Sequence, residues 1–250
     1  MSKLIFFDTE TTGNTEKDFL IQIAYKVGNE TFTGLYKPEI KIPPEASAVH
    51  HITNKMVADK ISFKESDDIS KIKKLFEDEN SVIVAHNASF DFAMIRKEGI
   101  DPKNFICTLR VARYLDKEEK IEKYNLQYLR YLLEIEVDGT AHDALGDVLV
   151  LEKLFERLKE KMIEEVPTEI GIPTQVGKKL TEQEAIEKMI EISSHPSLLH
   201  TFKFGKHNGI RIEDVIKTDR GYLQWLLDQK LNGDGIDEDW IYTLRHYLNK

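Results

Sequence analysis

The chain has 250 residues, of which 41% are hydrophobic and 32% are charged, a balance typical of a folded globular protein. Its formal net charge of −9, taken alone, argues against a nucleic-acid partner, because proteins that bind phosphate groups are usually basic. Bound divalent cations would reverse the local field, so this exclusion fails if much of the negative charge surrounds a metal site.

Membrane-spanning and secreted proteins carry features that this sequence lacks. The longest apolar runs, such as residues 81–85, are far too short to cross a bilayer. Residues 1–20 have neither the basic start nor the apolar stretch of a secretory signal. The single cysteine, Cys107, excludes an internal disulfide and is expected to be buried. We therefore expect a cytoplasmic protein with no membrane partner.

The first part of the chain alternates between strand-like and helix-like patterns. Residues 3–8, 19–27 and 31–38 are rich in apolar, β-branched and aromatic residues, and a Gly28-Asn29 turn joins the last two. These three strands are predicted to form an antiparallel meander, and residues 81–87 to form a further buried strand. Helical spacing of apolar residues follows in "DISKIKKLFED", "LQYLRYLLEI" and "LGDVLVLEKLFERLKEKM". The pattern indicates an α/β fold with a mixed sheet flanked by helices.

A second, smaller module follows a stretch that reads as a linker. Residues 166–177 carry two prolines and two glycines, and Thr181 with Glu184 three residues later predicts a capped helix start. Residues 201–215 predict two short strands around a turn at 205–209, and two amphipathic helices close the chain. We therefore predict a first domain over 1–163, a linker over 164–177 and a small α+β module over 178–250. The core of this module is expected to contain Trp225, Trp240, Tyr222 and Tyr247.

Carboxylates follow two of the predicted strands. Asp8 and Glu10 are two residues apart on a strand, so both side chains face one side, where like charges persist mainly with a cation between them. Oxygen ligands of this kind suit Mg²⁺ or Mn²⁺ and not zinc. The alternative to a metal site is that the strand ends in a polar loop that happens to be acidic. Asp91 lies just inside a helix after the next strand, where it would also favour the helix dipole.

A histidine and two further aspartates lie at the start of a later helix. His142 precedes this helix, and Asp143 and Asp147 are four residues apart, so both can lie on one face. Taken alone, this stretch also fits a capped amphipathic helix.

Three motifs together resemble a known family. "DTETTG", "VAHNASFD" and "HDALGD", in this order, are similar to the three motifs of the DEDD 3′–5′ exonucleases, in the DnaQ-like branch that carries a histidine. "LIQIA", "CTLRVARYL" and "VHHIT" also match, although the family often has glycine at the position of His51. The resemblance covers residues 3 to 158 and implies a ribonuclease H-like fold.

The resemblance also implies roles for individual residues. The implied metal ligands are Asp8, Glu10, Asp91 and Asp147, which would hold two Mg²⁺ or Mn²⁺ ions. His142 would be the general base, whereas Asp143 falls on no ligand position. Two metals about 3.5–4 Å apart can activate a water and stabilise the leaving 3′-oxygen. Thr11, Thr12 and Gly13 match the residues that hold the terminal 3′-hydroxyl.

Three further residues are candidates for contact with the substrate, and each could instead have a purely structural role. Phe90 is expected to stack on a base or to pack in the core. His50 lies where the family often has a histidine near the substrate end, and a hydrogen-bonded surface histidine is the alternative. Lys206 lies on the 205–209 turn, where it can contact phosphate or remain a solvated surface lysine.

The second module resembles the C-terminal part of exodeoxyribonuclease X-like enzymes, in which an "FGK…G" turn precedes a "YL.WLL" helix. Residues 201–230 hold six basic and four acidic side chains, a net of +2 against −11 for the rest of the chain. We therefore expect a 3′–5′ exodeoxyribonuclease that acts on single-stranded or duplex DNA ends and releases nucleoside 5′-monophosphates. The alternatives are an exoribonuclease and an inactive nucleic-acid adaptor. Self-association and a polymerase or repair partner are left open.

Overall fold

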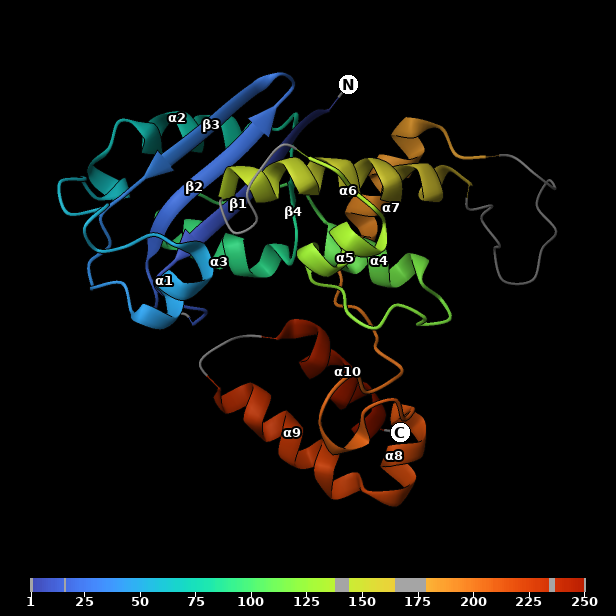
Figure 1. Ribbon diagram of the computed structural model, residues 1–250. Coiled ribbons are helices and arrows are strands. Elements are labelled where there is room, and N and C mark those ends of the chain that lie inside the picture. Colours follow the sequence, from blue (N-terminus) through green and yellow to red (C-terminus); the bar gives the residue numbers. More distant parts are fainter. Residues whose placement is uncertain (1, 16, 138–143, 165–178, 234–236, 250) are drawn as a thin grey trace.

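The computed structural model describes residues 2–15, 17–137, 144–164, 179–233 and 237–249, which form a larger and a smaller lobe (Figure 1). Residues 165–177 of the predicted linker, 164–177, lie outside the described residues, as do His142 and Asp143. Within the described residues, no helix combines the length and the apolar character needed to cross a bilayer.

The larger lobe is built on one mixed sheet, as predicted. Its described strands, in spatial order, are β3 (Glu30–Leu35), β2 (Leu20–Val27), β1 (Lys3–Thr11), β4 (Ser81–Ala85) and β5 (Phe105–Cys107). The first three strands pair antiparallel, which confirms the meander, and the turn between β2 and β3 contains Gly28 at a positive φ of 55°. The pairs β1–β4 and β4–β5 are parallel.

Helices cover both faces of this sheet, and the strand period of two decides which side chains meet which helices (Figure 1). Phe6 belongs to the core under α6 (Ala144–Glu164), where its ring meets Phe155 at 5.4 Å. Phe7 faces the opposite core, and its ring meets Phe76 of α2 (Asp68–Phe76) at 5.0 Å. The same opposite core contains residues of α3 (Ala88–Lys97). Residues of β1 with even numbers therefore face α6, and those with odd numbers face α2 and α3.

The remaining elements complete the two lobes. The larger lobe also contains α1 (Pro44–His50), the 3₁₀ turn η1 (Phe63–Glu65), α4 (Thr108–Leu115), α5 (Leu126–Leu132) and α7 (Glu182–Ser193). The predicted cap of α7 is present, with the Glu184 amide 3.2 Å from the Thr181 hydroxyl and the Glu184 carboxylate 2.7 Å from the Thr181 amide. Ala185 and Met189 of α7 are buried in the same core as α6. By packing, α7 belongs to the larger lobe, and the domain division stated from the sequence stays a prediction.

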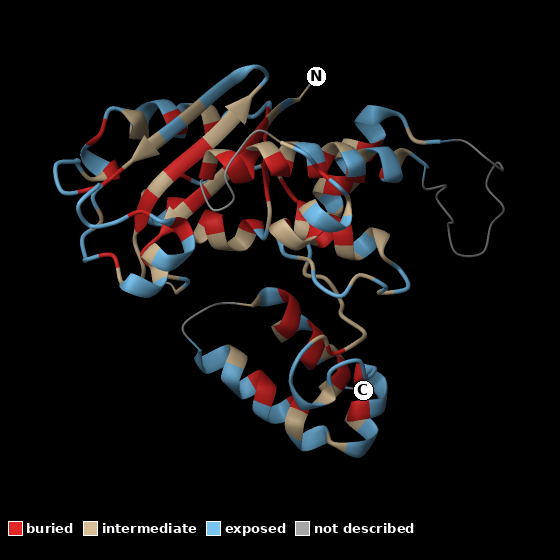
Figure 2. Cartoon of the chain, viewed as in Figure 1, coloured by how far each residue is buried: buried red, intermediate tan, exposed pale blue. Residues whose placement is uncertain are grey.

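The smaller lobe has its own buried core (Figure 2). It comprises the 3₁₀ turn η2 (Gly205–His207), α8 (Ile212–Thr218), α9 (Arg220–Asn232) and α10 (Glu238–Leu248). The two predicted strands are reduced to a single antiparallel bridge between Thr201 and Arg211, because helix α8 begins at Ile212. The prediction of a buried Trp225 is wrong, because it is 52% exposed, whereas the predicted burial of Trp240 of α10 is confirmed at 7% exposed.

Candidate active site

Three of the predicted acidic residues come together at the end of β1. Asp8 and Glu10 lie on the face of β1 that is covered by α6, and Asp147 lies in the first turn of α6. One carboxylate oxygen from each lies within 4.8 Å of the others. Carboxylates at this separation repel one another in the absence of a cation, and their oxygens are the ligands that hard divalent metals prefer. The arrangement therefore fits a divalent metal site.

Two glutamines contact the first turn of α6. The Ala144 amide, at the start of α6, lies 3.4 Å from Oε1 of Gln22, which is paired with Glu10 across the β1–β2 ladder. Gln127 of α5 donates a hydrogen bond through Nε2 to Oδ1 of Asp147. Asp147 is 9% exposed, so this contact and the helix N-terminus fix the direction of its carboxylate.

Asp91 contacts β1 through Thr9, the residue between Asp8 and Glu10. It is 3% exposed on α3, and its Oδ1 accepts hydrogen bonds from the Thr9 amide at 3.1 Å and the Thr9 hydroxyl at 2.6 Å. Thr9 has an odd number on β1 and faces α3, whereas Asp8 and Glu10 face α6. Burial raises the pKa of Asp91 to about 7, although the hydrogen bonds from Thr9 act in the opposite direction.

The residues predicted to hold the substrate end are engaged within their own loop. The Thr12 hydroxyl donates to Asp18 Oδ1 at 2.8 Å and accepts from the Phe19 amide at 2.9 Å, while the Thr11 hydroxyl donates to the Gly13 carbonyl. A Cβ at Gly13 would lie 2.6 Å from the Asp18 carboxylate, so a larger residue would displace Asp18 from its contacts with the loop. The loop after β1 is therefore braced by its own threonines around Asp18.

His50 lies beside this loop and is not a surface residue. It is 5% exposed, and its Nδ1 accepts a hydrogen bond from the Ile52 amide at 3.0 Å. Its Nε2 is buried near the Thr11 carbonyl, without a hydrogen bond of good geometry among the described residues. Burial lowers the pKa of His50, and the Thr11 carbonyl opposes this shift. His51 adopts a positive φ of 62° at the end of α1, which accounts for the glycine common at this position in the family.

Two residues predicted to contact the substrate, Phe90 and Lys206, lie outside the carboxylate cluster. Phe90, near the start of α3, is half-buried and lines a cleft of about 1280 Å³ between the lobes, whose lining does not include Asp8, Glu10 or Asp147. Lys206 is in the smaller lobe, where its Nζ lies 2.6 Å from Asp219 Oδ2 and 4.9 Å from the centre of the Tyr222 ring. Its charge is therefore paired within the protein.

Sequence reasoning missed three supporting residues. Thr9, Gln22 and Gln127 orient Asp91, the start of α6 and Asp147, respectively. The position of Thr9 was predictable from the strand period of two. It lies between Asp8 and Glu10, so its side chain must face the opposite side of the sheet. Nothing local distinguishes Gln127, whose contact with Asp147 depends on how α5 packs against α6.

Comparison with known proteins identifies the family. The sequence model of the Exonuclease family matches residues 5–155, and that of the Exodeoxyribonuclease X-like C-terminal family matches residues 202–230. This chain belongs to the exonuclease family. It is 32% identical over 252 residues to Exodeoxyribonuclease 10 of Escherichia coli (strain K12), with 98% of each chain covered. It is 33% identical to the DNA polymerase III subunit epsilon of Buchnera aphidicola, over 61% of this chain and 72% of that relative.

Solved structures agree with this assignment. A structure of Exonuclease X in complex with 5′ overhanging duplex DNA aligns with a TM-score of 0.53 and 27% identity, covering 76% of this chain and 99% of that chain. Exonuclease I of E. coli with a dT13 oligonucleotide aligns with a TM-score of 0.55 at 22% identity, over 65% of this chain and 42% of that one, a likeness of fold alone. The protein is an exonuclease with a ribonuclease H-like fold, and its acidic cluster suits a metal-dependent enzyme.

Proposed function

We propose that the protein is a metal-dependent 3′–5′ exodeoxyribonuclease that releases nucleoside 5′-monophosphates from DNA ends. The observation that carries this proposal is the approach of carboxylate oxygens from Asp8, Glu10 and Asp147 to within 4.8 Å of one another. Support for DNA as the substrate comes from the relative named Exodeoxyribonuclease 10 and from the neighbouring structure of Exonuclease X with duplex DNA.

The carboxylates would hold two Mg²⁺ or Mn²⁺ ions, because these hard cations bind oxygen ligands. Asp8, Glu10 and Asp147 would be three of the metal ligands, and Asp91 would be the fourth. Both hydrogen bonds from Thr9 reach Oδ1 of Asp91, which leaves Oδ2 as the oxygen for a cation. When bound, such cations supply activation of the attacking water and stabilisation of the leaving 3′-oxygen.

The remaining roles belong to other residues of the exonuclease motifs and to His50. His142 would take the proton of the attacking water, since an imidazole titrates near neutral pH. The loop of Thr11, Thr12 and Gly13 would hold the terminal nucleotide through its main chain, because the two threonine hydroxyls brace the loop itself. His50 would supply its buried Nε2 beside Thr11. Phe90 would stack on a base.

A degradation assay tests this function. Matched DNA and RNA oligonucleotides with a 5′ label are incubated with Mg²⁺ or with EDTA, beside the variants Asp147→Asn and Asp59→Asn. Asp59 is an exposed carboxylate outside the cluster and serves as the matched control. We expect a ladder that shortens from the 3′ end of DNA, is lost with EDTA and with Asp147→Asn, and persists with Asp59→Asn.

Other results of the assay would replace the proposal. Immediate release of the labelled 5′ nucleotide would reverse the polarity. A faster ladder on RNA would make the protein an exoribonuclease. An absence of any product with Mg²⁺ and with Mn²⁺ would favour a nucleic-acid adaptor.

A further inference from the structure

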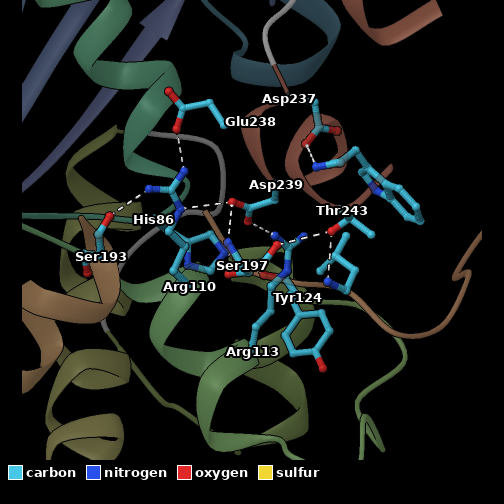
Figure 3. Close-up of polar contacts among 12 residues, drawn as sticks. His86, Arg110, Arg113, Tyr124, Ser193, Ser197, Asp237, Glu238, Asp239 and Thr243 are labelled. Carbon is cyan, nitrogen blue, oxygen red and sulfur yellow. Dashed lines mark hydrogen bonds and ion pairs between the residues drawn. The ribbon is translucent and has the colours of Figure 1, made fainter. Parts of the chain in front are cut away.

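The smaller lobe is fixed to the larger one by a buried group of charges (Figure 3). Arg110 of α4 contacts Asp239 of α10, with Nε 3.1 Å from Oδ1, and donates to the Ser193 carbonyl at 2.7 Å. Arg113 of α4 pairs with the other oxygen of Asp239, and the Ser197 amide donates to Oδ1 at 3.0 Å. The side chains of Arg110 and Asp239 are 8% and 7% exposed. We call Arg110, Arg113 and Asp239 the junction cluster.

The junction cluster lies in the wall of the cleft between the lobes. One wall of the cleft comes from α3, α4 and residues 116–125, and the other comes from residues 195–204 and the start of α10. Its volume, about 1280 Å³, exceeds the roughly 300–1,000 Å³ of sites for small ligands. Because direct ion pairs hold the two walls together, the cleft is preformed and suits an extended occupant.

The cleft lining includes residues next to the first exonuclease motif and within the second. Asn14 and Thr15, from the loop after β1, line the cleft, as do Asn87 and Phe90 at the start of α3. Asp91 is the next residue after Phe90 along α3. An occupant of the cleft that extended past Phe90 would therefore approach the candidate active site.

The lining presents aromatic surface from both lobes. Tyr114 on α4 and Phe204 in the smaller lobe are each 38% exposed and line the cleft, as does half-buried Phe90. Aromatic rings that remain accessible in a groove can stack on the bases of a single strand without selecting a sequence.

The charge of the lining is also more favourable to a polyanion than that of the chain as a whole. Among the described residues, seven basic and six acidic side chains line the cleft, whereas the chain carries −9. Most of these charges are engaged within the protein. Five of the six acidic side chains accept hydrogen bonds or form ion pairs: Asp116, Glu119, Asp237, Glu238 and Asp239. Five of the seven basic ones are engaged in the same way: Arg96, Arg110, Arg113, Lys203 and Lys230. Lys117 and Lys123 are exposed at the cleft, where they can approach phosphates.

We propose that the cleft binds the single-stranded DNA segment adjoining the end that is degraded, with the smaller lobe as its second wall. This inference rests on the proposed function for the identity of the strand. It assigns to Tyr114 and Phe204 a stacking role, and to Lys123 a phosphate contact, at positions beyond the nucleotide at the carboxylate cluster.

Binding without turnover separates this proposal from the proposed function. A 20-nucleotide single-stranded DNA with a 5′ fluorescein is titrated in EDTA, and its Kd is read from anisotropy for the parent, the double variant Tyr114→Ala/Phe204→Ala, Lys123→Glu and Tyr242→Ala. Tyr242, 44% exposed on α10 and outside the cleft lining, is the matched control. We expect the double variant to weaken Kd at least roughly thirty-fold, because two stacking contacts are lost. Lys123→Glu should weaken Kd in a salt-dependent way, and Tyr242→Ala should bind as the parent does.

Kinetics give a second readout that a general loss of folding would not produce. In Mg²⁺, the ratio of kcat/KM for the 20-nucleotide strand to that for a dinucleotide should fall in the double variant, mainly through KM. Equal Kd values for the double variant and the parent, or an unchanged ratio, would overturn the cleft proposal. If the parent degrades no DNA but the Kd shifts remain, the proposed function fails while the binding surface stands.

Discussion

The two lobes position their side chains by different physical means. In the larger lobe a sheet lies between two apolar cores, and the alternation along β1 sends Asp8 and Glu10 toward α6 and Thr9 toward α3. The smaller lobe has a single aromatic core, in which Phe202 stacks on Trp240 at 5.2 Å, and it is held in place by the junction cluster. The geometry of the catalytic lobe is therefore spread over two apolar cores, whereas the smaller lobe meets the larger one through polar contacts at the junction cluster and at Glu119.

The largest expected effect tests the catalytic side of this comparison. Replacement of Asp8 by Asn should reduce DNA degradation at least roughly a thousand-fold, because the cluster loses a charged ligand at the point where the transition state gains charge. The fold should persist, since neutralising one of three adjacent carboxylates relieves repulsion. Steady-state rates and circular dichroism of Asp8→Asn and of the control Asp59→Asn measure both outcomes. Comparable activity in the two variants would remove Asp8 from the site.

The junction cluster should give the next largest effect, on stability. Asp239→Ala leaves Arg110 and Arg113 without their buried partner, so we expect a loss of about 3–5 kcal/mol in the free energy of unfolding. Urea denaturation followed by tryptophan fluorescence measures this loss, because Trp240 is adjacent to Asp239 and buried in the smaller core. Glu238→Gln is the matched control: its side chain is 47% exposed, and its contact with Arg110 is expected to contribute less than about 1 kcal/mol. Equal losses in the two variants would contradict a special role for Asp239.

The same comparison explains how far the sequence alone leads. Strands β1 and β2 are predictable because apolar and β-branched residues persist along them and a glycine turn follows β2. The contact between Thr9 and Asp91 joins residues 82 positions apart, and no local pattern contains it. The position of Asp91 against β1 therefore appears only when α3 packs on the sheet.

The smaller lobe was harder to predict for a different reason. The run 201–215 has the alternation of strands, but only Thr201 and Arg211 form a bridge, and packing of Ile212 and Val215 in the core favours helix α8. Tertiary context thus overrides a short β-like pattern. Trp225 and Trp240 both lie at helical spacing, and only the crossing of α9 and α10 decides that Trp240 is the buried one.

His86 of the second exonuclease motif has a pKa lowered by burial, and Arg113 of the junction cluster contributes to this shift. His86, at the end of β4, bonds the Tyr124 carbonyl through Nε2 at 2.6 Å and the Thr108 hydroxyl through Nδ1 at 2.9 Å. Burial lowers the pKa of His86 to about 4; the Tyr124 carbonyl opposes this shift and Arg113 adds to it. Between about pH 6.5 and 4 the unfolded chain binds a proton that the folded chain does not. Stability should therefore fall on acidification through this range, by up to about 1.4 kcal/mol per pH unit.

The His86→Gln variant isolates this contribution, because glutamine cannot take up the proton. Urea unfolding at pH 4.5, 5.5 and 6.5 should give a shallower pH slope for the variant than for the parent. Other groups, including Asp91 with its raised pKa, cancel in the difference. Parallel slopes for the two proteins would mean that His86 titrates normally in the fold.

The smallest expected effect concerns local strain in the larger lobe, next to His50. His51 is exposed and ends α1 with a φ of 62°, a conformation that costs a residue with a Cβ about 1–2 kcal/mol. His51→Gly relieves this cost but adds freedom to the unfolded chain, so we expect a net gain of about 0.5–1 kcal/mol in the free energy of unfolding. His51→Ala keeps a Cβ at the same φ and should give no gain. If alanine stabilises as much as glycine, the effect comes from loss of the imidazole and not from the backbone, and the larger lobe stores no strain at this position.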